Sequence, residues 1–151
     1  MIPSEILDYY DRGREELRLD ASLGRLERIR TWEILERHLP PAPSCVLDVG
    51  GGTGVHRDLA DGIHRNPTGR PEWFTTAYFH RPEHVRPEIE ESGLTFEALI
   101  AVEGPGWFNQ QLDAWLDDEA ARQRLLDVLR RLETEPTLIG ASAHVLAVAR
   151  R

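Results

Sequence analysis

The glycine-rich stretch at residues 50–54, GGGTG, constrains the fold of this chain more than any other feature. The preceding residues 45–49, CVLDV, form a short apolar run that is typical of a buried parallel strand. Glycines directly after such a strand let the chain turn sharply and let a ligand approach the backbone N–H groups at the start of a following helix. The pattern predicts an α/β domain with a ligand-binding turn.

The spacing of these glycines distinguishes between two classes of cofactor. Dinucleotide-binding turns carry GxGxxG, but here Gly54 is followed by Val55 and the pattern is GxGxG. The stretch LDVGGGTG instead resembles motif I of class I S-adenosylmethionine-dependent methyltransferases. The resemblance implies that S-adenosylmethionine is the cofactor and that this loop holds it, through Asp48, Gly50, Gly51, Gly52 and Gly54.

The resemblance extends over nearly the whole chain. The segment YYDRGREELRL at 9–19 is similar to the N-terminal cap of a bacterial small-molecule subgroup of that family, and LIGASAHVLAVARR at 138–151 is similar to its C-terminal end. The family's cap closes over the cofactor, which implies a cofactor contact for Arg30. The implied fold is a Rossmann-like sheet of seven strands, with a small-molecule methyl acceptor bound above the later ones.

The chain lacks the central strands two to five of that family, with the junction near His56–Arg57. At about 30 residues per strand–helix unit, the missing part amounts to roughly 100 residues. In the family order 3-2-1-4-5-7-6, strands four and five separate strand one from strand seven. We therefore expect a reduced Rossmann-like α/β fold of about three strands with flanking helices. Exposed apolar edges on so small a sheet predict a homo-oligomer.

Apolar periodicity and helix-capping residues predict the other elements of one domain, 1–151. Its parts are a helical cap at 1–43, the first strand and glycine loop at 44–62, and a helix–strand part at 63–151. The expected elements are helices at 22–39, 82–91 and 108–134 and strands at 95–102 and 143–149. The helix at 82–91 is ended by Gly93, and Pro87 predicts a kink or a restart inside it.

The helix at 108–134 is expected in two pieces, with Asp117 or Asp118 as the cap of the second piece. Its expected buried stripe consists of Ala121, Leu125, Val128, Leu129 and Leu132.

Two side chains are candidates for catalysis. Tyr78 and His80 lie in a β-prone segment that could line an acceptor pocket, where either could act as general base in an O- or N-methylation. A purely structural role is the other interpretation of both. The turn EGPGW, from Glu103 to Trp107, similarly fits either a binding loop at the end of a strand or a plain tight turn.

The remaining histidines and the single cysteine do not form a metal-binding pattern. His80 and His84 are four residues apart, but Pro82 lies between them and no carboxylate pattern completes a site. His56, His64 and His144 are interpreted as scattered residues. Cys45 is the only cysteine, which excludes an intrachain disulfide and suits a reducing cytoplasm.

The charge balance excludes two classes of partner. A net charge of −8 without a local basic patch argues against nucleic acid and against anionic membranes. No apolar run approaches the roughly 20 residues of a membrane span. The sequence leaves two functions open. One is methyl transfer from S-adenosylmethionine to a small molecule, and the other is a non-catalytic, self-associating remnant of a methyltransferase, truncated or engineered.

Overall fold

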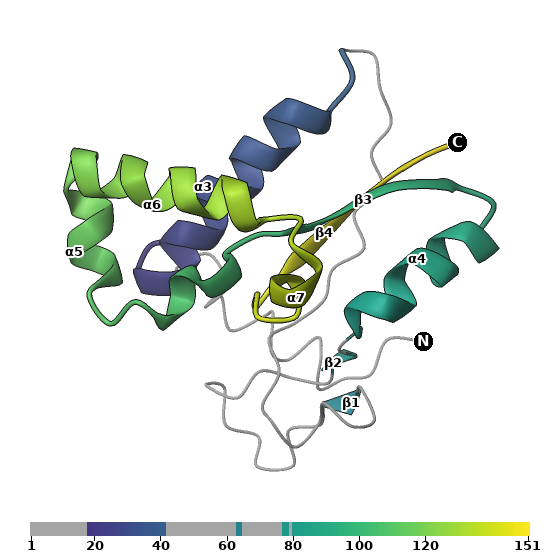
Figure 1. Cartoon of the computed structure of the whole chain (residues 1–151), viewed down its shortest axis with the longest axis horizontal. Coiled ribbons are helices and arrows are strands. Elements are labelled where there is room, and N and C mark those ends of the chain that lie inside the picture. The colour runs from purple at the N-terminus through teal and green to yellow at the C-terminus, as the bar shows by residue number, and fades with distance from the viewer. Residues whose placement is uncertain (1–17, 42–62, 65–76, 79) are drawn as a thin grey trace.

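The computed structural model describes residues 18–41, 63–64, 77–78 and 80–151. Figure 1 shows α6 lying across α3 on one side of the molecule, with the longer strands and α4 on the other. The mixture of helices and strands confirms an α/β fold at that level. The elements are α3 (Ser22–His38), β1 (Ile63–His64), β2 (Ala77–Tyr78), α4 (Pro82–Glu91), β3 (Thr95–Ala101), the 3₁₀ helix η2 (Gly104–Phe108), α5 (Leu112–Asp117), α6 (Glu119–Leu132), α7 (Pro136–Ile139) and β4 (Val145–Arg150).

The two longer strands form an antiparallel pair. β3 and β4 run in register from Thr95 opposite Arg150 to Ala101 opposite Val145, with an irregularity between Phe96 and Ala98. Both strands were expected, at 95–102 and 143–149, and both are confirmed. The short strands β1 and β2 pair separately. The predicted strand at 45–49 lies outside the described residues, so its place in the expected three-stranded sheet is not tested.

Helix α3 provides one side of both hydrophobic clusters. Its buried residues Leu26, Arg30 and Ile34 recur every four positions, which places them on one face. Leu26 packs with leucines of α5 and α6, whereas Ile34 packs with Ile100 and Val102 at the end of β3. The predicted stop is also confirmed. The helix ends at His38, and Leu39 is extended because the following proline disfavours a helical conformation there.

Helices α5 and α6 confirm the predicted two-piece helix. The Asp118 carboxylate accepts a hydrogen bond of 2.6 Å from the backbone N–H of Ala121 and caps α6. The predicted buried stripe was wrong at Val128, which is 51% exposed, while Leu126 is 5% exposed and belongs to the core. Successive residues of a helix are rotated by about 100°. The centre of the observed buried face is shifted toward Leu126 relative to the centre of the predicted stripe, and Val128 therefore lies outside the buried face.

Helix α4 contains Pro87, for which the sequence predicts a kink or a restart. The helix runs without a restart from Pro82 to Glu91, although Pro87 lies inside it. Proline removes one backbone donor, which leaves the carbonyl of Glu83 without its helical partner. Both residues are exposed, so water can satisfy that carbonyl. The predicted stop at Gly93 is confirmed, since its φ of +83° is in the region that favours glycine.

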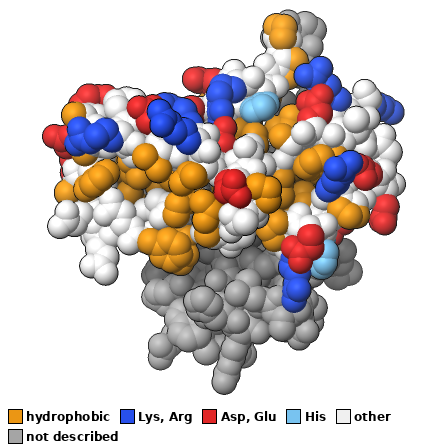
Figure 2. Space-filling view, viewed as in Figure 1, with side chains coloured by type: hydrophobic (Ala, Val, Ile, Leu, Met, Phe, Trp, Pro, Cys, Tyr) orange, Lys and Arg blue, Asp and Glu red, His pale blue; other side chains and the backbone are white. Residues whose placement is uncertain are grey.

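The surface combines charged and apolar areas. Figure 2 shows acidic and basic side chains interspersed along the upper edge of one face and hydrophobic side chains across its middle. The part of the chain that the structure describes contains no helix long and apolar enough to cross a bilayer. The exposed large apolar residues include Trp32, Trp107, Phe108 and Val128.

Candidate functional site

Glu103 lies just beyond β3 and is the centre of a compact polar cluster. Its side chain is fully buried, which is unusual for a carboxylate and requires hydrogen-bonding partners. Oε1 lies 2.5 Å from Nδ1 of His144. Oε2 accepts hydrogen bonds from the Ser142 hydroxyl at 3.0 Å and from the backbone N–H of His144 at 2.9 Å. These three hydrogen bonds all join the carboxylate to the segment that leads into β4.

The sheet register brings these residues together. Because Ala101 is opposite Val145, the residues that follow β3 meet the residues that precede β4. The backbone N–H of Val102 donates to the carbonyl of His144 at 3.0 Å, which extends the pairing by one step. Ser142 Oγ accepts from the N–H groups of Glu103 and Gly104, at 3.1 and 2.9 Å. The Ser142 hydroxyl is thus hydrogen-bonded to both the backbone and the carboxylate of Glu103.

A second acidic residue faces the cluster from α3. Glu27 Oε2 lies 3.8 Å from Nδ1 of His144. The same carboxylate is held by two hydrogen bonds from the Arg18 guanidinium, of 2.5 and 2.9 Å. Glu27 therefore contributes negative charge to the histidine while its own charge is balanced by Arg18.

These charges shift the titration of the buried pair. Burial lowers the pKa of His144, but the hydrogen bond and charge of Glu103, with the charge of Glu27, outweigh burial and the opposing charge of Arg18, so the pKa is raised. Burial raises the pKa of Glu103, but the hydrogen bonds and charge of His144 outweigh it, and the net pKa is lowered. The environment therefore favours a charged pair.

The geometry fixes which nitrogen of His144 is basic. A carboxylate can only accept, so the neutral imidazole carries its proton on Nδ1, facing Glu103, and keeps its lone pair on Nε2. Within the described residues no hydrogen bond to Nε2 is found, and the side chain is 16% exposed. The arrangement can accept a proton from a group placed next to Nε2.

Glu27, Glu103 and His144 also have ligand atoms within 4.8 Å of one another. Two ligands of one tetrahedral zinc ion lie about 3.4 Å apart, which follows from metal–ligand distances near 2.1 Å. The 2.5 Å between Oε1 of Glu103 and Nδ1 of His144 is shorter than that and is a hydrogen-bond distance. Arg18 also binds Glu27, so the cluster in this structure is held by hydrogen bonds and ion pairs among its own side chains.

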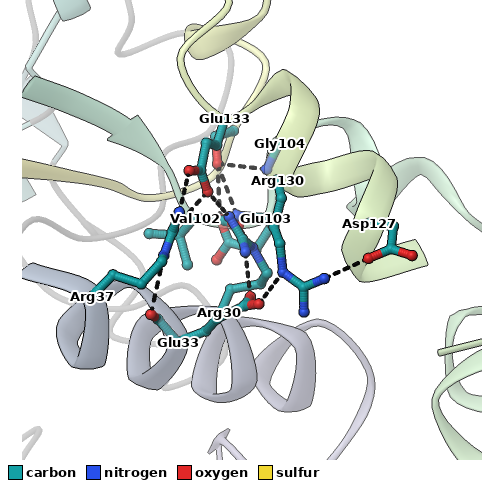
Figure 3. Close-up of polar contacts among 10 residues, drawn as sticks. Arg30, Glu33, Arg37, Val102, Glu103, Gly104, Asp127, Arg130 and Glu133 are labelled. Carbon is teal, nitrogen blue, oxygen red and sulfur yellow. Dashed lines mark hydrogen bonds and ion pairs between the residues drawn. The ribbon is translucent and has the colours of Figure 1, made fainter. Parts of the chain in front are cut away.

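Arg30 occupies a second buried network beside the site (Figure 3). Its Nε donates to the carbonyl of Val102 at 3.0 Å, and its two other nitrogens bind Glu33 and Glu133, the latter at 2.5 Å. Arg37 donates two bonds to the same Glu133, at 2.6 and 2.8 Å. The side chain of Arg30 is fully buried, and its protein partners use all three of its nitrogens. Arg30 thereby holds the end of β3, one residue before Glu103.

The other predicted site residues have different outcomes. Asp48, Gly50, Gly51, Gly52 and Gly54 lie outside the described residues, and only the backbone of Tyr78 is described, in β2. His80 precedes α4, and its Nε2 is 2.8 Å from Glu88 on that helix. The turn EGPGW overlaps the 3₁₀ helix η2, in which the Trp107 indole N–H donates to the carbonyl of Ala141 at 2.6 Å. The functional roles assigned to these residues remain predictions.

Sequence reasoning missed the pairing of Glu103 with His144. Glu103 was noted only within EGPGW, as part of a binding loop or a tight turn, His144 was interpreted as a scattered histidine, and Ser142 was not considered. The available signal was their position, since each lies at an end of one of two predicted strands. Had the two strands been taken as antiparallel neighbours, the end of one would have met the start of the other.

The shifted groups predict how stability depends on pH. Glu103 has a lowered pKa, and Glu133 does too, because bonds from Arg37 and Arg30 outweigh its burial. The stability that these two carboxylates contribute is complete above their unfolded-state pKa of about 4.3. It is lost as the pH falls through their pKa values in the folded protein. The contribution of His144, whose pKa is raised, is complete below about 6.5 and is lost as pH rises through the folded value. We therefore expect maximal stability between about pH 4.3 and 6.5.

Urea unfolding at a series of pH values measures this dependence. His144→Gln is the informative variant, since it should remove the decline on the alkaline side while retaining the decline on the acid side. A stability that is flat or rises from about pH 6.5 to 9 in the wild type would contradict the assignment of His144.

Comparisons with known proteins do not place the chain in a family. No protein-family model matches it, and no significant match to a curated protein or to a solved structure was found.

Proposed function

We propose that the chain binds S-adenosylmethionine through its glycine loop and transfers the methyl group to a small-molecule acceptor. The proposal rests on the resemblance of LDVGGGTG to motif I of class I methyltransferases. It is supported by the pairing of β3 with β4. These two strands correspond in chain order to the sixth and seventh strands of the family, which are neighbours in the order 3-2-1-4-5-7-6.

The observation that carries the proposal is the position of the Glu103–His144 pair. Glu103 directly follows the carboxyl end of β3, and the carboxyl ends of strands are where open α/β sheets bind their ligands. A buried carboxylate that orients a histidine there is costly to fold, and such groups concentrate at functional sites. The polar cluster therefore marks the expected acceptor side of the sheet.

The cofactor contacts remain those that the resemblance implies. Asp48 and the glycines 50, 51, 52 and 54 would hold S-adenosylmethionine. Arg30 is fully buried and its three nitrogens bind protein partners, so it would support the cap without donating to the cofactor. The bound cofactor supplies an electrophilic methyl group on a positively charged sulfur. The protein's contribution to such a transfer is mainly to position the acceptor in line with that methyl group. The single cysteine also supports a cytoplasmic location for this activity.

A second candidate function is a non-catalytic protein that self-associates. In the described part of the chain, β4 has β3 as its only neighbour, and its residues 145–149, VLAVA, carry no charge. Charged residues are a common means of protecting an edge strand from pairing, and this strand has none before Arg150. A homo-oligomer in which strands of two chains form one sheet would use this edge.

Isothermal titration with S-adenosylmethionine and S-adenosylhomocysteine tests the proposal. We expect binding tighter than about 100 μM, which corresponds to about −5.5 kcal/mol. Gly52→Arg should abolish it, because the side chain would fill the space that the cofactor needs. The matched control is Gly140→Arg, at an exposed position with φ of −68°, which should bind as the wild type does.

Two outcomes would overturn the proposal. One is the absence of heat at millimolar ligand, and the other is equal binding by the Gly52→Arg variant. Light scattering at low micromolar concentration separates the second candidate function, since a monomeric mass would exclude self-association.

A further inference from the structure

We propose that His144 is the general base of the methyl transfer, that Glu103 and Ser142 are its positioning residues, and that the methylated atom of the acceptor is an oxygen or nitrogen that carries a proton. This inference rests on the proposed function, because the methyl group must come from S-adenosylmethionine. Its geometric basis is independent, since every contact that carries it lies among the described residues. It differs from the sequence-based expectation, which offered Tyr78 and His80 for that role, and their own roles stay untested.

The orientation of the imidazole is the first step. Nδ1 is fixed against Oε1 of Glu103 at 2.5 Å, while the backbone N–H of the same histidine donates to Oε2 at 2.9 Å. Two contacts from one residue to one carboxylate leave little freedom for the ring to turn. The lone pair of the neutral ring is therefore on Nε2, the nitrogen without a hydrogen bond in the described part of the chain.

The carboxylate is itself held in place, which is the second step. Ser142 Oγ donates to Oε2 of Glu103 and accepts from the N–H groups of Glu103 and Gly104. A hydroxyl with one donated and two accepted bonds has no freedom to rotate, so the carboxylate plane is fixed. Because Glu103 is fully buried, water does not compete for its oxygens. Ser142 acts on the base only through Glu103.

The reaction balances with these groups alone and the methyl donor. The acceptor oxygen or nitrogen forms a bond to the methyl carbon, and the carbon–sulfur bond breaks with its electron pair going to sulfur. The proton of the acceptor moves to Nε2 of His144, which becomes an imidazolium. The negative charge of Glu103 stabilises that cation, as does Glu27 at 3.8 Å from Nδ1. A thioether acceptor would have no proton to give and would not need this base.

Three charged groups face His144 and set the pH range of the base. Glu103, from the end of β3, and Glu27, from α3, favour the protonated ring, whereas Arg18, which precedes α3, opposes them. The net effect is a raised pKa for His144. The lone pair on Nε2 is therefore available on the alkaline side of the usual histidine value of about 6.5, and transfer should rise with pH through that range.

Nuclear magnetic resonance of the ¹⁵N-labelled imidazole rings in the protein without ligand tests the inference. We expect His144 to be the Nδ1–H tautomer when neutral and to titrate above about 6.5. Glu103→Gln should lower the titration midpoint and lose the tautomer preference. Glu97→Gln is the matched control, because Glu97 pairs with Arg150 across the same two strands. This control should leave both readouts of His144 unchanged.

Ser142→Ala perturbs the orientation of the Glu103 carboxylate more mildly. It keeps the inference testable if the Glu103→Gln variant does not fold. It should bring the Nδ1 proton into faster exchange with water, because the carboxylate then rotates freely. Modification of Nε2 by diethyl pyrocarbonate, located by mass spectrometry, should occur at His144 and increase with pH.

The outcomes separate the two proposals. The Nε2–H tautomer, no modification of His144, or an unchanged midpoint in Glu103→Gln would overturn the role of His144 even if S-adenosylmethionine binds. The expected tautomer and modification without any cofactor binding would overturn the methyltransferase proposal and would leave His144 as a base without a methyl donor.

Discussion

Replacing Glu133 by glutamine is expected to lower the free energy of unfolding by about 3–5 kcal/mol, the usual cost of removing one partner from a buried ion pair. Glu133 binds Arg30 at 2.5 Å and Arg37 at 2.6 and 2.8 Å. Arg30 is fully buried, so its charge would lose an essential partner where water cannot replace it. Glutamine keeps the shape of the Glu133 side chain and one of its two acceptor oxygens. The loss of stability therefore measures the contribution of the negative charge.

Urea unfolding of the two proteins at neutral pH measures this loss. Glu119→Gln, on the same helix α6, is the matched control, because its ion pair with Arg122 is exposed and should be worth less than about 1 kcal/mol. Equal and small losses in both variants would show that the Arg30 network contributes little to folding.

Gly24→Ala is expected to destabilise the protein by about 1–3 kcal/mol, the range observed for overpacking. A Cβ atom on Gly24 would lie 1.9 Å from the carbonyl oxygen of Arg18. The chain before α3 passes directly over this glycine. The clashing atoms belong to the backbone, so a change of side-chain rotamer cannot relieve the clash. The sign is informative, because glycine to alanine inside a helix ordinarily stabilises by up to about 1 kcal/mol.

Thermal and urea unfolding of Gly24→Ala and Gly140→Ala test this packing. Gly140 has φ of −68° and only Pro82 within reach, at 3.9 Å, so its substitution should be neutral or mildly stabilising. A stabilised Gly24→Ala variant would show that the segment at Arg18 does not rest on α3. Arg18 binds Glu27. A destabilised variant should therefore also lose the positive charge that balances Glu27 beside His144.

Local patterns predicted the elements well because their signals are local. The prolines after Leu39, Gly93 after α4 and the Asp118 cap each act within a few residues, and each has the predicted effect. The exact buried face of α6 was harder to predict, because it depends on which neighbours pack against Leu126. At Pro87 the helix shows no restart, because the residue is exposed and water can compensate for its missing donor.

The polar site could be predicted only in part, because it depends on pairing between distant segments. Glu103 and His144 are 41 residues apart and meet through the register of β3 with β4. Arg30 and Glu133 are 103 residues apart and meet through the packing of α3 against the end of α6. Residue type and spacing in the sequence identify neither pair. The glycine loop, by contrast, is one continuous motif, and its recognition needed no tertiary information.

The most direct test of the central claim asks whether the glycine loop and the Glu103–His144 pair belong to one site. It is a titration of ¹⁵N-labelled protein with S-adenosylmethionine, followed by the backbone resonances of residues 50–54 and the resonances of His144. Our account predicts that both sets shift along one binding curve and that Gly52→Arg abolishes both shifts. Shifts in the loop without any at His144, or no shift in either at millimolar ligand, would contradict it.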